Sequence, residues 1–430
     1  MPSITLPQLP VRHTDLVQHI AKHPEVPLRE LIKPFREYEA TLRQAYAQDP
    51  DAEILKDAHV NVLPVFTKGI SDVKIRARDL DDESEDEKSK YIMALPDDVR
   101  RPNDSPAVVQ SFKEFQRNFN VFSESSLVDL NWDNVVASGS SVVNCLLPVP
   151  DPYNRTKRGL REFYHEKFCP ASDVDLFLYG LTEEEAIEKI KEIETGIRDA
   201  ILTETTTVRT KNAITICSQY PTRHIQIVLR IYKSVSEILT GFDIDCSGAA
   251  YDGKQVYCTP RALESYMTQI NQIDLSRRSP SYENRLSKYS HRGFEIYWPD
   301  FDRSRIDPTI FERSFQRTLG LARLLVLERL PTSSARDRYL DQRREERGRP
   351  ALNRYHRRFR SLAGNIKENH EDEVADWVDS EDVSNYHTFT IPYGEKFHAK
   401  KIEKLCYTKD IRKSSLTHTP WPHRSVLNSL

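Results

Sequence analysis

The sequence lacks a long uninterrupted hydrophobic run. Its most apolar stretch, LGLARLLVLERL, is broken by Arg323 and Glu328, and the opening MPSITLPQLPVRHTD has no apolar core of the kind that a secretory signal requires. These absences argue against a membrane span and against secretion. We therefore expect a cytoplasmic or nuclear protein with no membrane partner.

Paired cysteines are also missing. The six cysteines form no CxxC pair, and none has a histidine at zinc-finger spacing. This excludes a disulfide-stapled fold and a zinc finger, and it predicts small buried hydrophobic residues in a reducing compartment. The cysteines are Cys145, Cys169, Cys217, Cys246, Cys258 and Cys406.

An excess of charge of one sign is absent as well. The formal net charge is −3 over 430 residues, so any attraction to nucleic acid must come from a local basic surface. The composition, 38% hydrophobic and 30% charged, is that of a globular protein with room for two or three packed units.

Periodicity and composition divide the chain into four parts. The first contains the amphipathic stretch VPLRELIKPFREYEATLRQAY and the acidic run DLDDESEDEK, which is too charged to bury. The predicted parts are an N-terminal helical extension (1–104, with the acidic linker near 79–88), a core (105–260), a C-terminal helical region (261–385) and a tail (386–430).

Strands and helices alternate in the core, which predicts an α/β (α+β) fold. A helix with phenylalanines at spacings of three and four precedes the apolar strand NVVASGSS. A basic segment (145–170), interpreted as a flexible lid, an acceptor contact or a disordered surface loop, leads to the strand SDVDLFLYG. Thr182 and Glu185 then form a capping box at the start of a helix with an isoleucine stripe.

The later part of the core is rich in β-branched residues. VRTKNAITIC and RHIQIVLRIYKS predict strands, and GFDIDCSGAAYDG predicts another on which Asp243 and Asp245 share a face. Thr259-Pro260 and Ser279-Pro280 each resemble an N-cap followed by a first-turn proline, so two helices are expected over 260–292. A further helix is expected near Asp307-Pro308.

Two aspartates interrupt the apolar strand at residues 173–179. Strand alternation places the carboxylates of Asp173 and Asp175 on one face, where like charges require a counter-cation. Hard oxygen ligands favour Mg²⁺ or Mn²⁺. With Asp245 as a third ligand, or failing it Asp243, the set would hold two ions of the kind that catalyse displacement at phosphorus.

A Gly-Ser pair follows the preceding strand. A glycine at position 139 lets backbone N–H groups approach phosphate oxygens, and a helix beginning in SSVVNCLL would add a favourable dipole. Serine and glycine are also ordinary turn residues, so this feature alone is a weak signal.

The order SGSS, SDVDLFL, FDIDCS resembles the active-site pattern of the DNA polymerase β-like nucleotidyltransferase superfamily. The resemblance covers about residues 108–260 and implies a nucleotidyltransferase-type mixed sheet. It implies that Asp173, Asp175 and Asp245 are catalytic metal ligands for two Mg²⁺ (or Mn²⁺) ions. It also implies that Gly139, Ser140 and Ser141 bind the nucleotide, a nucleoside triphosphate whose NMP is transferred to an acceptor hydroxyl on RNA, protein or a small molecule.

Basic residues outside these motifs could neutralise a triphosphate, and Lys211 and Arg278 are the ones we assign to that role. The arginine-rich run from Arg336 to Arg360, with aromatic residues among the arginines, fits an RNA-binding stripe or a solvated helix.

Two other classes stay open. Glycosyltransferases that depend on a metal also carry an Asp-x-Asp after apolar residues, but they do not need a second aspartate strand. A catalytically inactive scaffold could keep the nucleotidyltransferase fold and use it for interaction alone.

Overall fold

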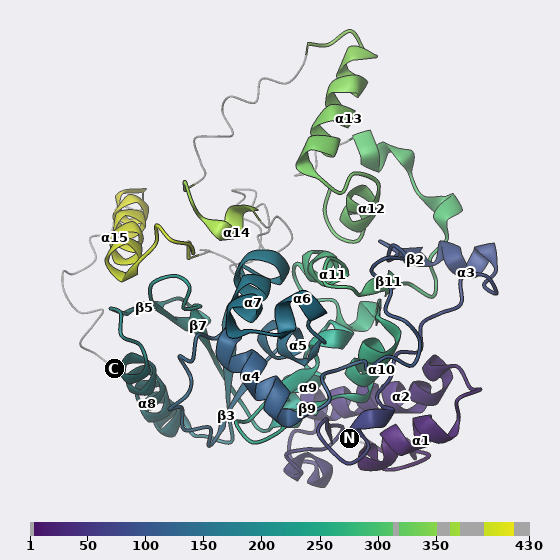
Figure 1. Cartoon of the computed structure of the whole chain (residues 1–430), viewed down its shortest axis with the longest axis horizontal. Helices are drawn as coiled ribbons and strands as arrows, with labels where there is room; N and C mark the ends of the chain where they lie inside the picture. Colours follow the sequence, from purple (N-terminus) through teal and green to yellow (C-terminus); the bar gives the residue numbers. More distant parts are fainter. Residues whose placement is uncertain (1–3, 313–317, 351–361, 370–390, 417–430) are drawn as a thin grey trace.

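The computed structural model describes residues 4–312, 318–350, 362–369 and 391–416 (Figure 1). It has a mixed α/β architecture with two sheets, which confirms the predicted fold class. The strands are β1 (Leu63–Pro64), β2 (Tyr91–Ile92), β3 (Val135–Ser138), β4 (Val174–Tyr179), β5 (Thr206–Arg209), β6 (Ala213–Cys217), β7 (Ile225–Tyr232), β8 (Ala249–Tyr251), β9 (Val256–Cys258), β10 (Ile270–Gln272) and β11 (Glu295–Tyr297).

The larger sheet has eight strands in the order β1-β9-β8-β3-β4-β7-β6-β5. One pair, β4 and β7, is parallel, and every other pairing in this sheet is antiparallel. The smaller sheet has the order β10-β11-β2. The parallel pair matters for function, because it brings the starts of β4 and β7 to the same edge of the sheet.

Helices cover both sheets, and Figure 1 shows α13 projecting away from the rest of the chain. The α-helices are α1 (Leu16–Lys22), α2 (Leu28–Gln48), α3 (Glu85–Ser89), α4 (Phe112–Phe122), α5 (Ser140–Leu146), α6 (Asp151–Asn154), α7 (Lys157–Glu162), α8 (Glu183–Ala200), α9 (Val235–Thr240), α10 (Pro260–Thr268), α11 (Tyr282–Ser290), α12 (Ala322–Arg329), α13 (Ser333–Glu345), α14 (Ile366–Asn369) and α15 (Ala399–Leu416).

Short 3₁₀ helices and a π-helix are the remaining helical elements of the described chain. They are the 3₁₀ helices η1 (His13–Asp15), η2 (Glu53–Lys56), η3 (Ile70–Asp72), η5 (Asp245–Ser247), η6 (Leu275–Arg277), η7 (Arg303–Arg305) and η8 (Pro308–Glu312), and the π-helix η4 (Phe163–Phe168).

Local signals in the sequence account for the helices around the sheet. Ser111 caps α4 by accepting a hydrogen bond from the Glu114 N–H at 3.2 Å. The predicted capping box of α8 is present, with the Thr182 hydroxyl and the Glu185 carboxylate each bonded to the other's backbone. Thr259 caps α10, whose first residue is a proline.

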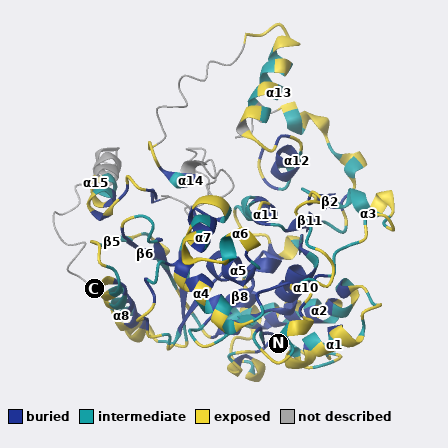
Figure 2. Cartoon of the chain, viewed as in Figure 1, coloured by how far each residue is buried: buried dark blue, intermediate teal, exposed yellow. Residues whose placement is uncertain are grey.

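The two faces of the eight-stranded sheet pack against different groups of residues. Val174, Leu176 and Leu178 of β4 enter the main core, whose buried residues are among those drawn dark blue in Figure 2. Phe177 enters a smaller apolar cluster on the opposite face, and strand alternation places Asp175 on that side too. The aspartates therefore avoid the main core, which explains how an apolar strand tolerates them.

The first hundred residues take part in this architecture. β1 extends the eight-stranded sheet by pairing with β9, and α2 packs against α10. The predicted amphipathic stretch is α2, with Pro34 inside it and Ile32, Phe35 and Leu42 buried.

Three local predictions are wrong. GFDIDC is not a strand, because Asp245 lies in η5 and the next strand begins at Ala249. Both helices expected over 260–292 are present, but the second begins at Tyr282 and not at Pro280, and the Ser279 hydroxyl donates to Asp243 instead of capping. The helix near Asp307-Pro308 is the short 3₁₀ turn η8.

The basic segment 145–170 is helical and packed, which removes the disordered-loop interpretation. It contains α6, α7 and the π-helix η4, and Tyr164 is fully buried. Arg161 and His165 both contact the Glu124 carboxylate, at 2.6 and 3.1 Å, and so tie the segment to the end of α4.

Five of the six cysteines are buried and all six are free thiols, as expected from their spacing. Within the described ranges, no helix combines the length and the apolar character needed to cross a membrane.

Candidate functional site

The Gly-Ser turn and the aspartate pair meet at one edge of the sheet. β3 and β4 are antiparallel, with Ser138 opposite Asp175, so the residues after β3 lie beside the start of β4. Gly139 has φ +75° and ψ −139°, a conformation that L-residues rarely adopt, and α5 begins at the next residue. The predicted strand-turn-helix arrangement at Gly139 and Ser140 is thus confirmed.

The neighbouring parallel strand supplies two residues that the sequence analysis did not select. Gln226 of β7 is opposite Asp175, and its Nε2 donates to Asp175 Oδ1 at 3.1 Å. His224 stands one step before β7, beside Asp173, and is completely buried. Only the register of β4 against β7 identifies these positions, because neither residue lies in a recognisable motif.

Asp245 does not join the pair. It is 1% exposed, and its carboxylate accepts hydrogen bonds from Arg36 (2.8 Å), Arg261 (3.1 Å) and the Gln272 N–H (3.0 Å). Burial opposes ionisation, but the two arginines outweigh it and hold the pKa of Asp245 below its ordinary value. The predicted metal ligand is therefore part of a buried ion-pair network.

Asp243, the alternative third ligand, is also occupied by protein groups. Arg285 Nη2 lies 2.5 Å from Asp243 Oδ2, and the Ser279 hydroxyl donates to the same oxygen at 2.7 Å. No group of three His, Cys, Asp or Glu residues suited to a metal ion occurs within the described residues. The expected three-carboxylate cradle for two ions is not formed.

The remaining pair still has the electrostatics of a cation site. Burial, and then the neighbouring Asp173, raise the pKa of Asp175 to about 6, while Lys288 and Lys367 act in the opposite direction. Magnesium is commonly held by one or two carboxylates together with water and substrate phosphates. Asp173 and Asp175 fit one such ion.

Cations come to the site from α11 and the residues after it, not from the positions that the sequence analysis chose. Lys288 lies near enough to act on Asp175, and Arg292 donates to Asn144 Oδ1 (3.2 Å) and to Ser172 Oγ (2.8 Å). Arg292 thereby joins α5 to the residue before the aspartate pair. The spacing of four between Lys288 and Arg292 was the available signal.

Lys211 and Arg278 are not among the cations that act on Asp175. Lys211 is exposed in the turn between β5 and β6, next to Asn212, whose carbonyl accepts from the Leu229 N–H. Arg278 is exposed and lies against Gly320. The geometry favours the α11 cations over both of them.

The start of α5 carries unsatisfied polar atoms. Ser140 and Ser141 are buried, and Ser141 Oγ and Asn144 Nδ2 have no hydrogen-bond partner in the described part of the chain. Buried polar groups without partners are rare in folded proteins, and they often indicate a missing ligand or water. Of the residues that the resemblance assigns to nucleotide binding, Ser141 thus retains free hydrogen-bonding capacity.

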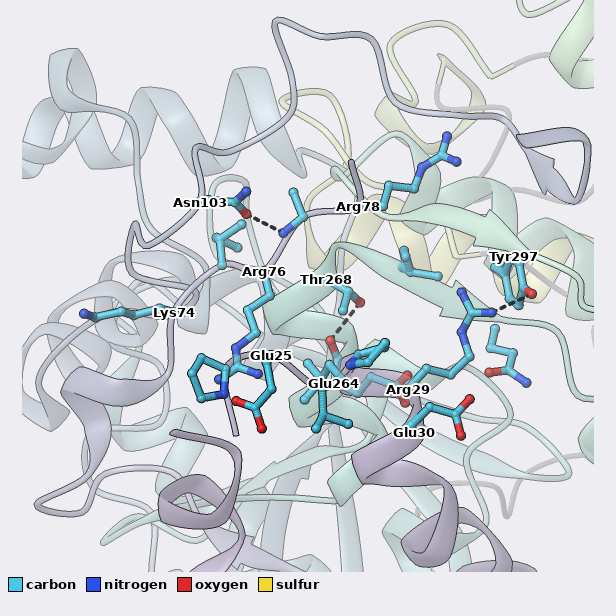
Figure 3. Close-up of a pocket in the computed structure, with 18 of the residues that line it drawn as sticks. Glu25, Arg29, Glu30, Lys74, Arg76, Arg78, Asn103, Glu264, Thr268 and Tyr297 are labelled. Carbon is cyan, nitrogen blue, oxygen red and sulfur yellow. Dashed lines mark hydrogen bonds between the residues drawn. The ribbon is translucent and has the colours of Figure 1, made fainter. Parts of the chain in front are cut away.

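A large pocket lies elsewhere, and Figure 3 shows its lining. It has a volume of about 880 Å³, and none of the predicted site residues lines it. At least three of its five cations already have partners: Arg29 donates to the Tyr297 hydroxyl (Figure 3), Arg36 pairs with Glu264, and Arg76 donates to the carbonyls that end α1.

The arginine-rich run lies partly outside the described residues, which leave out 351–361. In the described part, Arg343 and Arg347 both pair with Glu312, and Arg343 also pairs with Glu346. This pairing favours the interpretation of α13 as a solvated helix.

Comparison with known proteins gives two matches. Residues 110–269 match a family described as Gabija anti-defense 2 (Gad2) family protein. "Uncharacterized protein R883" of Acanthamoeba polyphaga mimivirus is 33% identical over 219 residues, which are 47% of this chain and 44% of that protein. The chain spans less than half the length of this curated relative. The family match includes Gly139, Asp173 and Asp175 and ends before Lys288 and Lys367.

Proposed function

We propose that the chain is a metal-dependent nucleotidyltransferase that transfers NMP from a nucleoside triphosphate to an acceptor hydroxyl. The observation that supports the proposal best is the meeting of the Gly139 turn with Asp173 and Asp175 at one sheet edge, through the pairing of Ser138 with Asp175. A turn that can bind phosphate, beside a carboxylate pair that can bind its counter-ion, is what a triphosphate requires.

Each residue has a defined part in the proposal. The turn at Gly139, Ser140 and Ser141 binds the departing pyrophosphate through backbone N–H groups and the unpartnered Ser141 hydroxyl. Lys288, on α11, neutralises negative charge that develops on the phosphates. Arg292 is a positioning residue, because it holds α5 against Ser172 and so sets the turn relative to the aspartates.

Asp173 and Asp175 would hold one Mg²⁺ ion, which when bound neutralises phosphate charge and favours ionisation of the acceptor hydroxyl. Gln226 fixes the orientation of the Asp175 carboxylate by donating to one of its oxygens, which leaves the other for the ion. Gln226, which lies opposite Asp175 on the neighbouring strand, is neutral and supplies no third carboxylate. The proposal therefore needs a single ion, whereas the sequence suggested two.

The test is transfer of label from each of the four α-labelled NTPs, with Mg²⁺ or Mn²⁺, into RNA, protein and small-molecule acceptors. Label should move with the wild type and should not move with Asp175→Asn. Asp199→Asn, which changes an exposed aspartate of α8, is the matched control and should keep full activity.

Outcomes separate the alternatives. Transfer that survives Asp175→Asn would show that this constellation is not the active site. Nucleotide binding without transfer would favour an inactive scaffold. Because Asp245 no longer distinguishes a nucleotidyltransferase from an Asp-x-Asp glycosyltransferase, UDP-sugars belong in the same assay, and sugar transfer would replace the proposal.

The family match supports a second candidate, in which the chain acts against a defence system, as the family's description states for its members. Expression of the chain in cells protected by a Gabija system should then reduce that protection. If the reduction persists in Asp175→Asn, the chain acts by binding; if it is lost, the proposed transfer reaction is the means.

A further inference from the structure

A buried lysine forms an ion pair with one of the proposed metal ligands. Lys367, in α14, is 7% exposed, and its Nζ lies 2.6 Å from Asp173 Oδ2. The Asp173 side chain remains 26% exposed, so the pair lies at the mouth of the site. Lysine is almost never buried to this degree unless a carboxylate meets it. The ion pair therefore accounts for the position of this side chain.

The segment that carries Lys367 is held on the core by a built set of contacts. Asn365 Oδ1 accepts from the Tyr393 N–H at 3.0 Å, and the Ile366 N–H donates to the Tyr393 carbonyl at 2.7 Å. The Tyr393 hydroxyl donates to the Pro221 carbonyl at 2.8 Å, and its ring meets His224 edge-on at 5.2 Å. Chain segments far apart in sequence thus converge beside Asp173.

Apolar packing fixes the same region. Ile391, Phe397 and Ile402 form a buried cluster with Cys217 of β6. Residues 365–367 and 391–402, which we call the C-terminal clasp, therefore dock on the strands next to the aspartates. The clasp delivers one positive charge to Asp173.

We propose that Lys367 is an internal counter-cation of Asp173 that a divalent ion must displace, so that metal occupancy weakens docking of the clasp. This inference rests on the proposed function, since it concerns the regulation of the same site. An ammonium on Asp173 Oδ2 and a divalent ion on the same carboxylate repel each other at short range and compete for its negative charge. Linkage makes the effect reciprocal, so any change that releases the clasp also raises the affinity of the site for the metal.

The first experiment measures Mn²⁺ binding to the full chain by electron paramagnetic resonance of free Mn²⁺. Lys367→Gln should bind Mn²⁺ about tenfold more tightly than the wild type, the change that the loss of one charge-assisted hydrogen bond to a competitor corresponds to. Lys191→Gln is the matched control. It removes a positive charge from α8, where Lys191 pairs with Glu188 in an exposed ion pair outside the clasp, and it should leave Mn²⁺ affinity unchanged.

The second experiment follows backbone hydrogen exchange over residues 365–367 and 391–402. Exchange there should rise in Lys367→Gln without metal, and in the wild type when Mn²⁺ is saturating. Asp173→Asn should give the same rise without metal, because it removes the other half of the ion pair.

The outcomes distinguish this inference from the proposed function. Equal Mn²⁺ affinity in the wild type and Lys367→Gln, with binding lost in Asp173→Asn, would overturn the counter-cation role and leave the transferase intact. Binding that appears only in Lys367→Gln would support the role strongly. Absence of Mn²⁺ binding in every variant would overturn both. Transfer activity is not used as a readout, so an inactive scaffold that binds metal can still be tested.

Discussion

Substitution of Asp245 by asparagine separates the role predicted from the sequence from the one found in the structure. Asp245 belongs to a network in which three arginines (Arg36, Arg261 and Arg277) meet three buried carboxylates (Glu39, Asp245 and Glu264). Asparagine keeps the shape of the side chain but removes its charge, which leaves three cations facing two buried carboxylates.

The magnitude follows from burial. Asp245 and Arg261 are each 1% exposed, and removal of one partner from a buried ion pair costs about 3–5 kcal/mol. Folded domains are stable by about 5–15 kcal/mol in total, so Asp245→Asn should remove a large part of the free energy of unfolding. Water cannot compensate at this site as it can at the surface.

Urea unfolding followed by circular dichroism measures the loss as a fall in the transition midpoint. Asp51→Asn is the control, because Asp51 is 97% exposed and 3.6 Å from Lys233, and it should cost less than about 1 kcal/mol. Mn²⁺ binding is measured on the same samples under conditions where both are folded. A stability close to wild type together with loss of Mn²⁺ binding would refute the structural role and restore Asp245 as a metal ligand.

Three further predictions concern the site. His224 is buried, and its pKa is lowered to about 3. Its neutral form therefore contributes stability that is complete above pH 6.5 and falls as the pH drops. Between pH 7 and 5, urea titrations should show that the wild type loses about 2 kcal/mol more of its free energy of unfolding than His224→Phe does. Gly139→Ala should cost about 1–3 kcal/mol of stability, because Gly139 has a positive φ. The new Cβ would meet Phe242 only at an ordinary contact distance of 3.7 Å, so no steric clash adds to this cost. Gly196→Ala in α8 should be neutral or stabilising, and equal shifts in melting temperature for the two variants would contradict the prediction. Asp175→Asn should abolish NMP transfer and leave the circular dichroism spectrum unchanged. Wild-type turnover in that variant would refute the assignment of Asp175 to the active site.

The sequence alone determined the elements whose signals are local. The capping box at Thr182, the phenylalanine spacing of α4 and the strand-turn-helix at Gly139 depend on residues within a few positions of one another, so their patterns could be interpreted without knowing the fold. The same holds for Asp173 and Asp175, because alternation along one strand fixes which face both share.

Tertiary structure decided what those residues meet. GFDID has the alternation of a strand, yet Arg36, which is 209 residues away in sequence, and Arg261 capture Asp245 in a 3₁₀ turn. Gln226 reaches Asp175 only through the register of two parallel strands, and Lys367 reaches Asp173 across 194 residues. Pairings between residues so far apart in sequence depend on how the whole chain packs, because no local sequence pattern predicts them. The sequence thus placed Asp173 and Asp175 on one face, and the fold selected the partners of these aspartates and of Asp245.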